Sequence, residues 1–380
     1  MRHQSLQQYI FYLSCFFAAS ILVPPIFSQF QHHAATAIFY ESGTGSTNVN
    51  STNTICRNRS EWMRDATWLH NRSLYEITLP GTHDSGAYML YNDYLRGFVA
   101  DWIEDAMELA QLLHIDMYHI VKMWALSQAT SPVGNVAGQL RAGARYIDLR
   151  CSWNGTAWVT FHFEQGVLCN VLMRDISDFL KTFTSEIVYV ELGSEWSPSK
   201  KEPDESIMKL LYDDIRDTLL PFHIPTNLDL HSLTVSQLVK ANARCLIASP
   251  HRPPEYETEI FISDSIIYNS YADTDILKDM IAYNDDRVTE FTQQKHKKKK
   301  QLFKISWTLT PGPRAITESI IPGKPRSLYE LSQSAFQETM AWAQAHEADT
   351  YPRFGQILIS DFFCESKIFE ASMLSPSPVK

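Results

Sequence analysis

Residues 74–86, LYEITLPGTHDSG, decide the fold, because an apolar stretch ends here in a turn of small and polar residues. We expect a strand at 74–80 that delivers His83 and Asp84 to its carboxyl end. Outward from this stretch, short apolar runs alternate with helical patterns. Further strands are predicted at residues 146–151, 158–163, 187–192, 244–248, 266–271, 303–309 and 356–362, and helices at 98–126, 171–183, 206–220 and 328–345.

This alternation of strands and helices predicts an α/β fold with a mainly parallel sheet. Roughly eight strands favour a TIM-type (β/α)8 barrel, regular or distorted, as a single domain. An open doubly wound sheet is the alternative. Catalytic groups of such barrels sit at the carboxyl ends of strands, and the reactive residues of this chain follow predicted strands. The pair Asn154-Gly155 predicts a tight hairpin turn.

Length and charge limit the classes of function. A chain of 380 residues that is 44% hydrophobic can fill the core of one large barrel. Its formal net charge of −10 argues against a uniformly basic surface, so nucleic acid is not expected as a partner. The cluster KHKKKK at 295–300 is read as a solvated loop, with contact to anionic lipid as the alternative.

The N-terminus predicts export. Residues 9–23, YIFYLSCFFAASILV, are apolar and uncharged, and Pro24 and Pro25 end the run. The run is shorter than the roughly 20 residues of a spanning helix, so we expect a signal peptide at 1–28, with an uncleaved anchor as the alternative. A flexible leader at 29–70, the barrel at 71–370 and a tail at 371–380 would follow.

Sequons and cysteines agree with a secreted, extracellular glycoprotein. The acceptor motif for N-glycosylation occurs at Asn50, Asn58, Asn71 and Asn154. If Cys15 leaves with the signal peptide, the remaining cysteines are Cys56, Cys151, Cys169, Cys245 and Cys364. Their dispersed spacing argues against a zinc site, and disulfides are permitted outside the cell. The odd count leaves at least one thiol free or paired between chains, and the pairing stays open.

Four polar residues have the chemistry of proton transfer and phosphate binding. His83, in a turn of small residues, suits proton transfer, although a turn-capping role is the alternative. His162 lies on an apolar strand, where a structural histidine is the more common case. Strand alternation places Asp148 and Arg150 on one face with Tyr146. The planar guanidinium suits phosphate oxygens, and a structural ion pair is the alternative.

Together these segments resemble a known family. LPGTHDSG at 79–86, GARYIDLR at 143–150 and a histidine one strand later resemble the X domain of phosphatidylinositol-specific phospholipase C (PI-PLC). The resemblance is to its bacterial and short X-domain-containing members and covers about residues 74–365. FKISWTLTPGP at 303–313 and ILISDFF at 357–363 resemble the closing strands of the family.

The resemblance implies a role for each matched residue. His83 would be the general base that activates the inositol 2-hydroxyl, and His162 the acid that protonates the leaving oxygen. Arg150 would neutralise the phosphate. Asp84 would orient His162, and Asp361 would support His83. The implied activity is that of a phosphoric diester hydrolase acting on phosphatidylinositol or glycosylphosphatidylinositol (GPI) lipids, with transient contact to a membrane surface.

The resemblance also implies chemistry without a metal or other cofactor. In calcium-dependent members, acidic ligands stand where this chain has Asp148 and Arg150, and an asparagine stands at Asp84. Calcium requires several oxygen ligands, whereas an arginine supplies a fixed cation. A metal-dependent glycerophosphodiesterase or sphingomyelinase D type of enzyme, and a catalytically silent binding module on the same barrel, remain alternatives.

The head-group pocket departs from the family pattern. Phe163 follows His162 where a glycine is usual, and the strand at 187–192 has Gly193 and no matching lysine. Asp148, Glu191 and Tyr271 are predicted to contact substrate. Glu195 and Asn269 are further options for sugar contact, and the helix at 98–126 is read as core, with a lipid-touching lid as the alternative.

Overall fold

The computed structural model describes most of the chain that follows the predicted leader. The described residues are 56–89, 134–162, 164–193, 204–293, 301–318, 323–325, 327–346, 352 and 354–374. The predicted signal peptide, the helix at 98–126, the lysine cluster at 295–300 and the residues Asn50, Phe163 and Glu195 lie outside them.

Eight parallel strands curl into a distorted barrel, as the sequence predicted. Their order in the sheet is β8-β7-β6-β2-β1-β11-β10-β9. They comprise β1 Leu79–Thr82, β2 Tyr146–Leu149, β6 Val188–Leu192, β7 Cys245–Ser249, β8 Phe261–Ile262, β9 Ile267–Tyr268, β10 Leu302–Ser306 and β11 Ile357–Ser360. The distortion lies at β8 and β9, which are joined by the single turn α10, Ser263–Ile266. In the described part of the chain no ladder joins these two strands.

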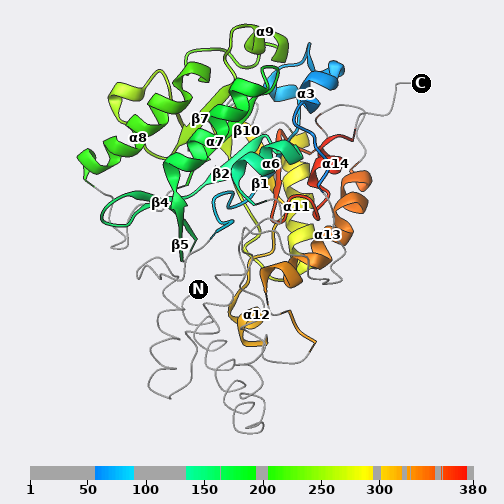
Figure 1. The fold of residues 1–380 in the computed structure, drawn as a ribbon. Coiled ribbons are helices and arrows are strands. Elements are labelled where there is room, and N and C mark those ends of the chain that lie inside the picture. Colours follow the sequence, from blue (N-terminus) through cyan, green and yellow to red (C-terminus); the bar gives the residue numbers. More distant parts are fainter. Residues whose placement is uncertain are drawn as a thin grey trace, which may run out of the picture.

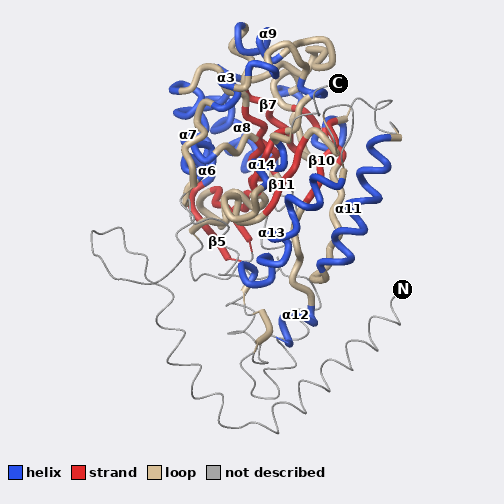
Figure 2. The backbone as a smooth tube through the Cα atoms, turned by 90° about the vertical axis from the view of Figure 1, so that its right-hand side faces the viewer, coloured by secondary structure: helices blue, strands red, loops and turns tan. Residues whose placement is uncertain are grey.

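Helices surround the sheet, most of them between two strands and the last helix after the last strand (Figures 1 and 2). They are α6 Val136–Ala142, α7 Cys169–Thr182, α8 Glu205–Leu219, α9 Val235–Lys240, α11 Leu277–Thr292, α12 Pro313–Glu318, α13 Leu328–Ala345 and α14 Ile368–Ser372. Helix α13 has the predicted bounds, because Ser327 caps its first turn by accepting a hydrogen bond from Glu330 N (3.2 Å). In Figure 1, α9 lies at the upper end of the barrel and α12 at the lower end.

The strands separate two apolar clusters. Ile147, Val190 and Ile305 face the helices and belong to the larger cluster. Tyr146, Tyr189 and other residues of opposite parity belong to a smaller one that fills the barrel interior. Because side chains alternate across a strand, each strand contributes to both clusters. This fixes Tyr146, Asp148 and Arg150 on the inner side, as predicted.

A second, antiparallel sheet leaves the barrel directly after Arg150. It contains β3 Cys151–Trp153, β4 Trp158–His162 and β5 Glu164–Leu168. The predicted turn at Asn154-Gly155 is confirmed: Gly155 has φ +99°, and Asn154 Oδ1 accepts hydrogen bonds from the backbone of Thr156 (3.0 Å) and Ala157 (2.9 Å). In Figure 1, β4 and β5 extend toward the lower end of the barrel.

The predicted leader is too long. Residues 56–70 form the short helix α3, Trp62–Asp65, and a 3-10 turn, Thr67–Leu69, with Met63 and Leu69 fully buried. A buried ion pair anchors this segment, since Glu186 accepts hydrogen bonds from Met63 N (3.3 Å) and Arg64 N (3.1 Å) and pairs with Arg145. The segment therefore closes the amino-terminal end of the barrel, and only residues before 56 remain a candidate leader.

Two strand predictions need correction. The first strand begins at Leu79, not at residue 74, because Ser73 and Glu76 form a capping box around a 3-10 turn, Leu74–Glu76. The strand at 266–271 is reduced to the two residues of β9, which leaves Tyr271 in a loop. At the carboxyl end, α14 continues to Ser372, two residues into the predicted tail, with Ala371 and Ser372 buried.

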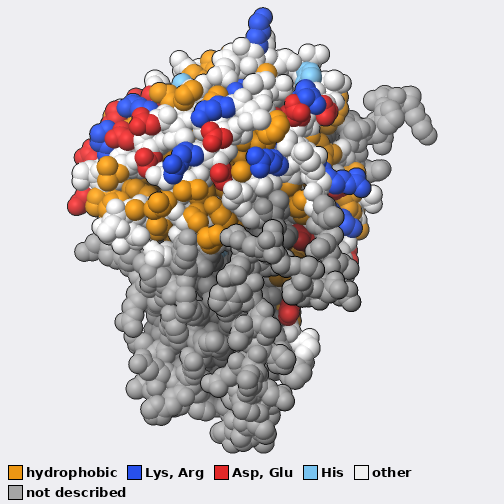
Figure 3. Space-filling view, in the orientation of Figure 1, with side chains coloured by type: hydrophobic (Ala, Val, Ile, Leu, Met, Phe, Trp, Pro, Cys, Tyr) orange, Lys and Arg blue, Asp and Glu red, His pale blue; other side chains and the backbone are white. Residues whose placement is uncertain are grey.

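Cysteines and surface charge agree with the sequence analysis. Disulfides join Cys56 to Cys364 and Cys151 to Cys169, and among the described cysteines Cys245 is free and buried. Such bonds are typical of extracellular proteins. Within the described ranges, no helix has both the length and the apolar character needed to cross a membrane. Among the coloured side chains of Figure 3, acidic and basic ones are interspersed over the upper part of the face, and hydrophobic ones gather lower in the coloured area.

Candidate active site

Five predicted residues converge at the carboxyl end of the barrel. His83 and Asp84 follow β1, Arg150 follows β2, Asp361 follows β11, and His162 ends β4 of the small sheet. The turn after β1 is tied to β2, because Ser85 N donates to Asp148 O (2.8 Å) and Asp148 N donates to Ser85 Oγ (2.9 Å). Strands far apart in sequence therefore present their polar ends to one space.

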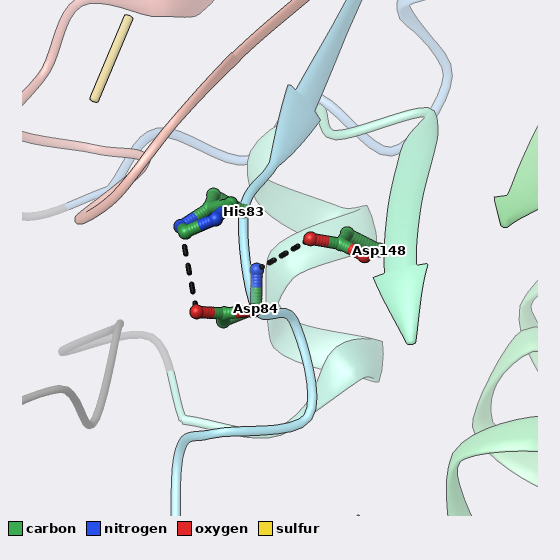
Figure 4. A group of neighbouring side chains, drawn as sticks. All are labelled: His83, Asp84 and Asp148. Atoms are coloured by element: carbon green, nitrogen blue, oxygen red, sulfur yellow. Dashed lines mark hydrogen bonds and ion pairs between the residues drawn. The ribbon is translucent and has the colours of Figure 1, made fainter. Parts of the chain in front are cut away.

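Asp84 has a strained backbone that directs its side chain into the site. Its φ is +45°, in the left-handed region that few residues other than glycine adopt. Its N–H donates to Asp148 Oδ2 (3.2 Å), which holds the turn in this conformation (Figure 4). Strain of this kind persists where surrounding contacts impose it, and it concentrates at functional sites.

Asp84 is the hub of the site. Its Oδ1 lies 2.6 Å from Arg150 Nε, and its Oδ2 lies 3.0 Å from His162 Nε2 and 3.5 Å from His83 Nδ1. One carboxylate thus contacts both predicted catalytic histidines and the predicted phosphate-binding arginine. Its own side chain is 3% exposed, whereas that of Arg150 is 25% exposed.

His83 is held on both sides of its ring. Nδ1 lies 2.9 Å from Asp361 Oδ1, and Nε2 lies 3.0 Å from Arg150 Nη2. In the neutral form of the ring, Nδ1–H would donate to Asp361 and Nε2 would accept a hydrogen bond from the guanidinium. The support of His83 by Asp361, predicted from the resemblance, corresponds to a direct contact in the structure.

The charges shift two pKa values in opposite directions. Burial acts to lower the pKa of His83, but the carboxylates Asp84 and Asp361 more than offset burial and raise it to about 9. Burial acts to raise the pKa of Asp84, but Arg150, and then His162 and His83, hold it well below its ordinary value. At neutral pH, Asp84 is therefore an anion held next to the guanidinium of Arg150.

Three groups at this site have the chemistry of metal ligands. Ligand atoms of His83, Asp84 and Asp148 lie within 4.8 Å of one another (Figure 4). However, Arg150 contacts all three: besides its bonds to Asp84 and His83, Nη2 lies 3.6 Å from Asp148 Oδ2. The fixed guanidinium already supplies the positive charge that a cation would bring to these carboxylates.

A buried lysine that sequence reasoning missed lies at the floor of the site. Lys304 Nζ, on β10, lies 2.8 Å from Glu191 Oε2 and 2.8 Å from the Tyr146 hydroxyl, which also donates to Glu191. Glu191 is paired in register with Asp148 on the neighbouring strand, which places it next to the cluster of predicted catalytic residues. Burial, and then Glu191, raise the pKa of Tyr146 well above its ordinary value, so the phenol stays a donor. The lysine absent from β6 thus has a counterpart from the other side of the barrel.

The residues predicted to contact substrate do not all lie at the cluster around Asp84. Asp148 and Glu191 lie inside the barrel beside the cluster. Tyr271 is 52% exposed in the loop after β9, so its predicted contact with substrate stays a prediction. Asn269 also lies beyond the end of β9.

Comparison with known sequences points to one family, although no protein-family model matches the chain. Human PI-PLC X domain-containing protein 2 is 25% identical over 276 residues, covering 71% of this chain and 83% of that protein. Human PI-PLC X domain-containing protein 3 is 20% identical over 283 residues, covering 73% and 82%.

Solved structures show the same fold. A mutant of phosphatidylinositol-specific phospholipase C from Staphylococcus aureus superposes with a TM-score of 0.56 at 14% identity, covering 83% of this chain and 98% of that one. The enzyme from Listeria monocytogenes gives a TM-score of 0.52 at 16% identity, covering 84% and 100%. The membrane binding of the Staphylococcus aureus protein has been modulated in a further structure with a TM-score of 0.53. The predicted family resemblance is confirmed by these matches.

Proposed function

We propose that this chain, which is similar to PI-PLC X domain-containing proteins and has the fold of bacterial PI-PLC, is a metal-independent phosphodiesterase that cleaves phosphatidylinositol or GPI lipids. The inositol 2-hydroxyl would attack its own phosphodiester, which releases diacylglycerol and leaves a cyclic inositol phosphate. The attacking and leaving groups belong to one molecule, so the protein needs to supply orientation, proton transfer and charge stabilisation.

The observation that carries this proposal is the contact of one carboxylate with two imidazoles and a guanidinium. Asp84 lies within 3.5 Å of His83 and His162 and pairs with Arg150 at 2.6 Å. Cleavage by cyclisation needs a base, an acid and a cation within reach of a single phosphate. The imidazoles of His83 and His162 and the guanidinium of Arg150 meet at one carboxylate and are each partly exposed, which supports their acting on one phosphate.

Each residue has a defined task in the proposed mechanism. His83 accepts the proton of the 2-hydroxyl, and Asp361 holds the resulting imidazolium through Nδ1. Arg150 donates to the non-bridging oxygens, where negative charge accumulates in the transition state. His162, held by Asp84, donates a proton to the departing diacylglycerol oxygen. Later attack by water on the cyclic product would use the same two histidines with their roles exchanged.

The floor of the site supports a hydroxyl-bearing head group. Glu191 is an acceptor next to Asp148, and Lys304 neutralises its charge so that the floor does not repel the phosphate above it. An unpaired carboxylate at this depth would cost several kcal/mol of desolvation. The pair therefore favours neutral polyols over head groups that carry further negative charge at the floor.

The setting of the proposed reaction is a membrane surface outside the cell. The two disulfides support secretion, and the predicted signal peptide and glycans belong to the same proposal. The structure of the Staphylococcus aureus enzyme concerned with its membrane binding supports transient contact with lipid.

The proposal is tested by assaying phosphatidylinositol vesicles with the wild-type protein and the variants His83→Ala and His162→Ala. Removal of a general acid or base typically costs about 10²- to 10⁴-fold in rate. We expect both variants to lose turnover by at least that factor while their thermal unfolding remains cooperative. The wild-type protein should release a cyclic inositol phosphate, and EDTA should leave the rate unchanged.

A control and two outcomes separate the alternatives. His231→Ala alters a histidine that stacks on Tyr75 with ring centroids 3.5 Å apart, outside the site, and should retain full activity. Loss of activity with EDTA would favour the metal-dependent enzymes. Vesicle binding without turnover in the wild-type protein would favour the silent binding module.

A further inference from the structure

His162 differs from the other proposed catalytic residues in its support. His83, Asp84, Arg150 and Asp361 each follow a strand of the parallel barrel. His162 ends β4 in the separate three-stranded sheet, which leaves the barrel after Arg150 and rejoins it at Cys169, the first residue of α7. The position of His162 therefore depends on how this sheet is attached.

A disulfide closes the base of this sheet. Cys151 begins β3 and Cys169 begins α7, and the bond between them joins positions 18 residues apart with their Cα atoms 6.4 Å apart. Both cysteines are essentially fully buried. The bond encloses the whole of β3, β4 and β5, so His162 lies on a closed loop whose one end adjoins Arg150.

The disulfide lies close to His162 along the ladder. Cys151 is in register with Thr160, two residues before His162 on β4. The next backbone bond, from Phe161 N to Arg150 O (3.0 Å), links the His162 strand to the residue that precedes Cys151. A change in the path of Cys151 would therefore reach both Arg150 and His162.

The packing around Thr160 leaves little room for a shifted sheet. Thr160 Oγ1 donates to Gly86 O in the turn after His83 (3.1 Å). A Cβ on Gly86 would lie 2.6 Å from Thr160 Cγ2, and one on Gly166 would lie 2.3 Å from Thr160 Oγ1. Both contacts are closer than real Cβ atoms approach. The sheet thus fits the catalytic turn in one tight position, and the disulfide holds its base there.

We propose that the Cys151–Cys169 disulfide is a positioning element that keeps His162 against Asp84, so that the activity depends on this bond being oxidised. The inference rests on the proposed function. Reduction by a dithiol would break the S–S bond, transfer two electrons and two protons to give two thiols, and leave the reductant as a cyclic disulfide. Without the bond, His162 would sample positions away from Asp84.

The second disulfide supplies a matched control. Cys56–Cys364 joins the segment before α3 to the residues after β11 and closes a loop of sequence separation 308. It contributes no residue to the small sheet. Burial raises the pKa of the remaining Cys245 thiol to about 12, so this group stays protonated and unreactive in both experiments.

The test compares Cys151→Ala/Cys169→Ala with Cys56→Ala/Cys364→Ala on phosphatidylinositol vesicles. A displacement of about 1 Å in a catalytic group can cost on the order of 10²-fold. We expect the first variant to lose about 10- to 100-fold in kcat with KM within about threefold, because Arg150 and the floor remain. The second variant should retain wild-type kcat even where its thermal unfolding temperature falls.

Reduction of the intact protein gives an independent measurement. Dithiothreitol should lower kcat once alkylation and mass spectrometry detect thiols at Cys151 and Cys169, and reoxidation should restore it. The same reduction of Cys151→Ala/Cys169→Ala should leave kcat unchanged. If the double variant does not fold, the reduction and reoxidation of the wild-type protein alone decide the question. Wild-type kcat in a fully reduced protein would overturn the inference.

A spectroscopic readout separates this inference from the proposed function. In protein labelled with ¹⁵N-histidine, the imidazole resonances of His162, assigned with His162→Ala, should move in Cys151→Ala/Cys169→Ala and not in Cys56→Ala/Cys364→Ala. If the wild-type protein cleaves no phosphatidylinositol while these resonances move as expected, the function fails and the positioning role holds. Unmoved resonances together with an unchanged kcat would refute the positioning role alone.

Discussion

Two arginines at opposite ends of the barrel show how the same side chain serves two purposes. Arg145 and Arg150 lie on either side of β2, five positions apart. Arg145 is fully buried and paired with Glu186, with Nε 2.9 Å from Glu186 Oε2. Arg150 is 25% exposed and lies among Asp84, Asp148 and His83. The guanidinium of Arg145 also donates to the carbonyls of Leu140, Ala144, Arg59 and Ser60.

The difference lies in what surrounds each guanidinium. The partners of Arg145 are one carboxylate and backbone oxygens, which tie α6 and the segment before α3 to the sheet. The partners of Arg150 are ionisable side chains, and Arg150 itself is partly exposed. At the closed end of the barrel, the charge of Arg145 is fully paired with Glu186 and with backbone carbonyls that hold the fold together. At the open end, the charge of Arg150 is only partly enclosed by protein, and the proposed function assigns it to the phosphate.

The largest expected effect separates these two arginines. Arg150→Met should lower kcat/KM for phosphatidylinositol by about 10³-fold, because it removes the cation that stabilises the transition state. Arg145→Met should lower the free energy of unfolding by about 3–5 kcal/mol, because it leaves Glu186 buried without its charge partner. Steady-state kinetics and chemical denaturation measure the two quantities.

The comparison requires the two effects to be independent. Arg150→Met should lower the free energy of unfolding less than Arg145→Met does, because His162 and His83 remain beside Asp84. Folded Arg145→Met should keep its kcat/KM within a few-fold. A large loss of stability in Arg150→Met would assign this arginine to the structure. A large loss of activity in fully folded Arg145→Met would show that the closed end also shapes the site.

The pH dependence of kcat/KM tests His83, at the open end of the barrel, and does not involve Arg145. The pKa of His83, about 9, lies above its ordinary value of 6.5. As the proposed base, His83 must be neutral, so kcat/KM should rise about tenfold per pH unit toward pH 9. The imidazolium is the favoured form, so its contribution to stability is complete below about pH 6.5 and is lost as pH rises through 9.

Asp361→Asn sharpens this test. Removing the carboxylate that lies 2.9 Å from Nδ1 should lower the pKa of His83 and move the rising limb toward lower pH by about one unit. Asp178→Asn, which alters an exposed pair with Lys181, should leave the profile as in the wild-type protein. A limb that stays in place in Asp361→Asn would remove His83 from the role of base.

The open end was largely predictable from sequence because its determinants are local. The turn at 81–86 places His83 and Asp84 together, and strand alternation places Asp148 and Arg150 on one face. Lys304 was missed, although the same rule applies: Phe303 and Ile305 face the helices, so Lys304 faces the interior. Its partner Glu191 lies 113 residues away, and pattern alone does not pair such positions.

The closed end was poorly predictable because its determinants are distant. Residues 56–70 have no clear periodicity, so they read as a leader. Their order comes from Glu186, more than 120 residues away, and from the disulfide of Cys56 with Cys364. Contacts of such separation leave little trace in a local pattern, whereas the amphipathic pattern of α13 predicted both of its ends.

The smallest expected effect concerns the room that Arg150 occupies. A Cβ on Gly193, at the end of β6, would lie 2.9 Å from Arg150 Cγ, closer than real Cβ atoms approach. Cγ lies near the backbone, so it cannot yield as the tip of the side chain could. Gly193→Ala should therefore displace the guanidinium and lower kcat/KM by about tenfold, with little change in unfolding free energy. Gly323→Ala is the opposite control, because Gly323 has φ +84° and no atom of a described residue lies within 4 Å of its Cβ position. This substitution should cost about 1 kcal/mol of stability and no activity. Wild-type kinetics in Gly193→Ala would mean that the activity does not depend on the present position of Arg150. The distinction between Arg145, which serves stability, and Arg150, which serves the reaction, would then fail.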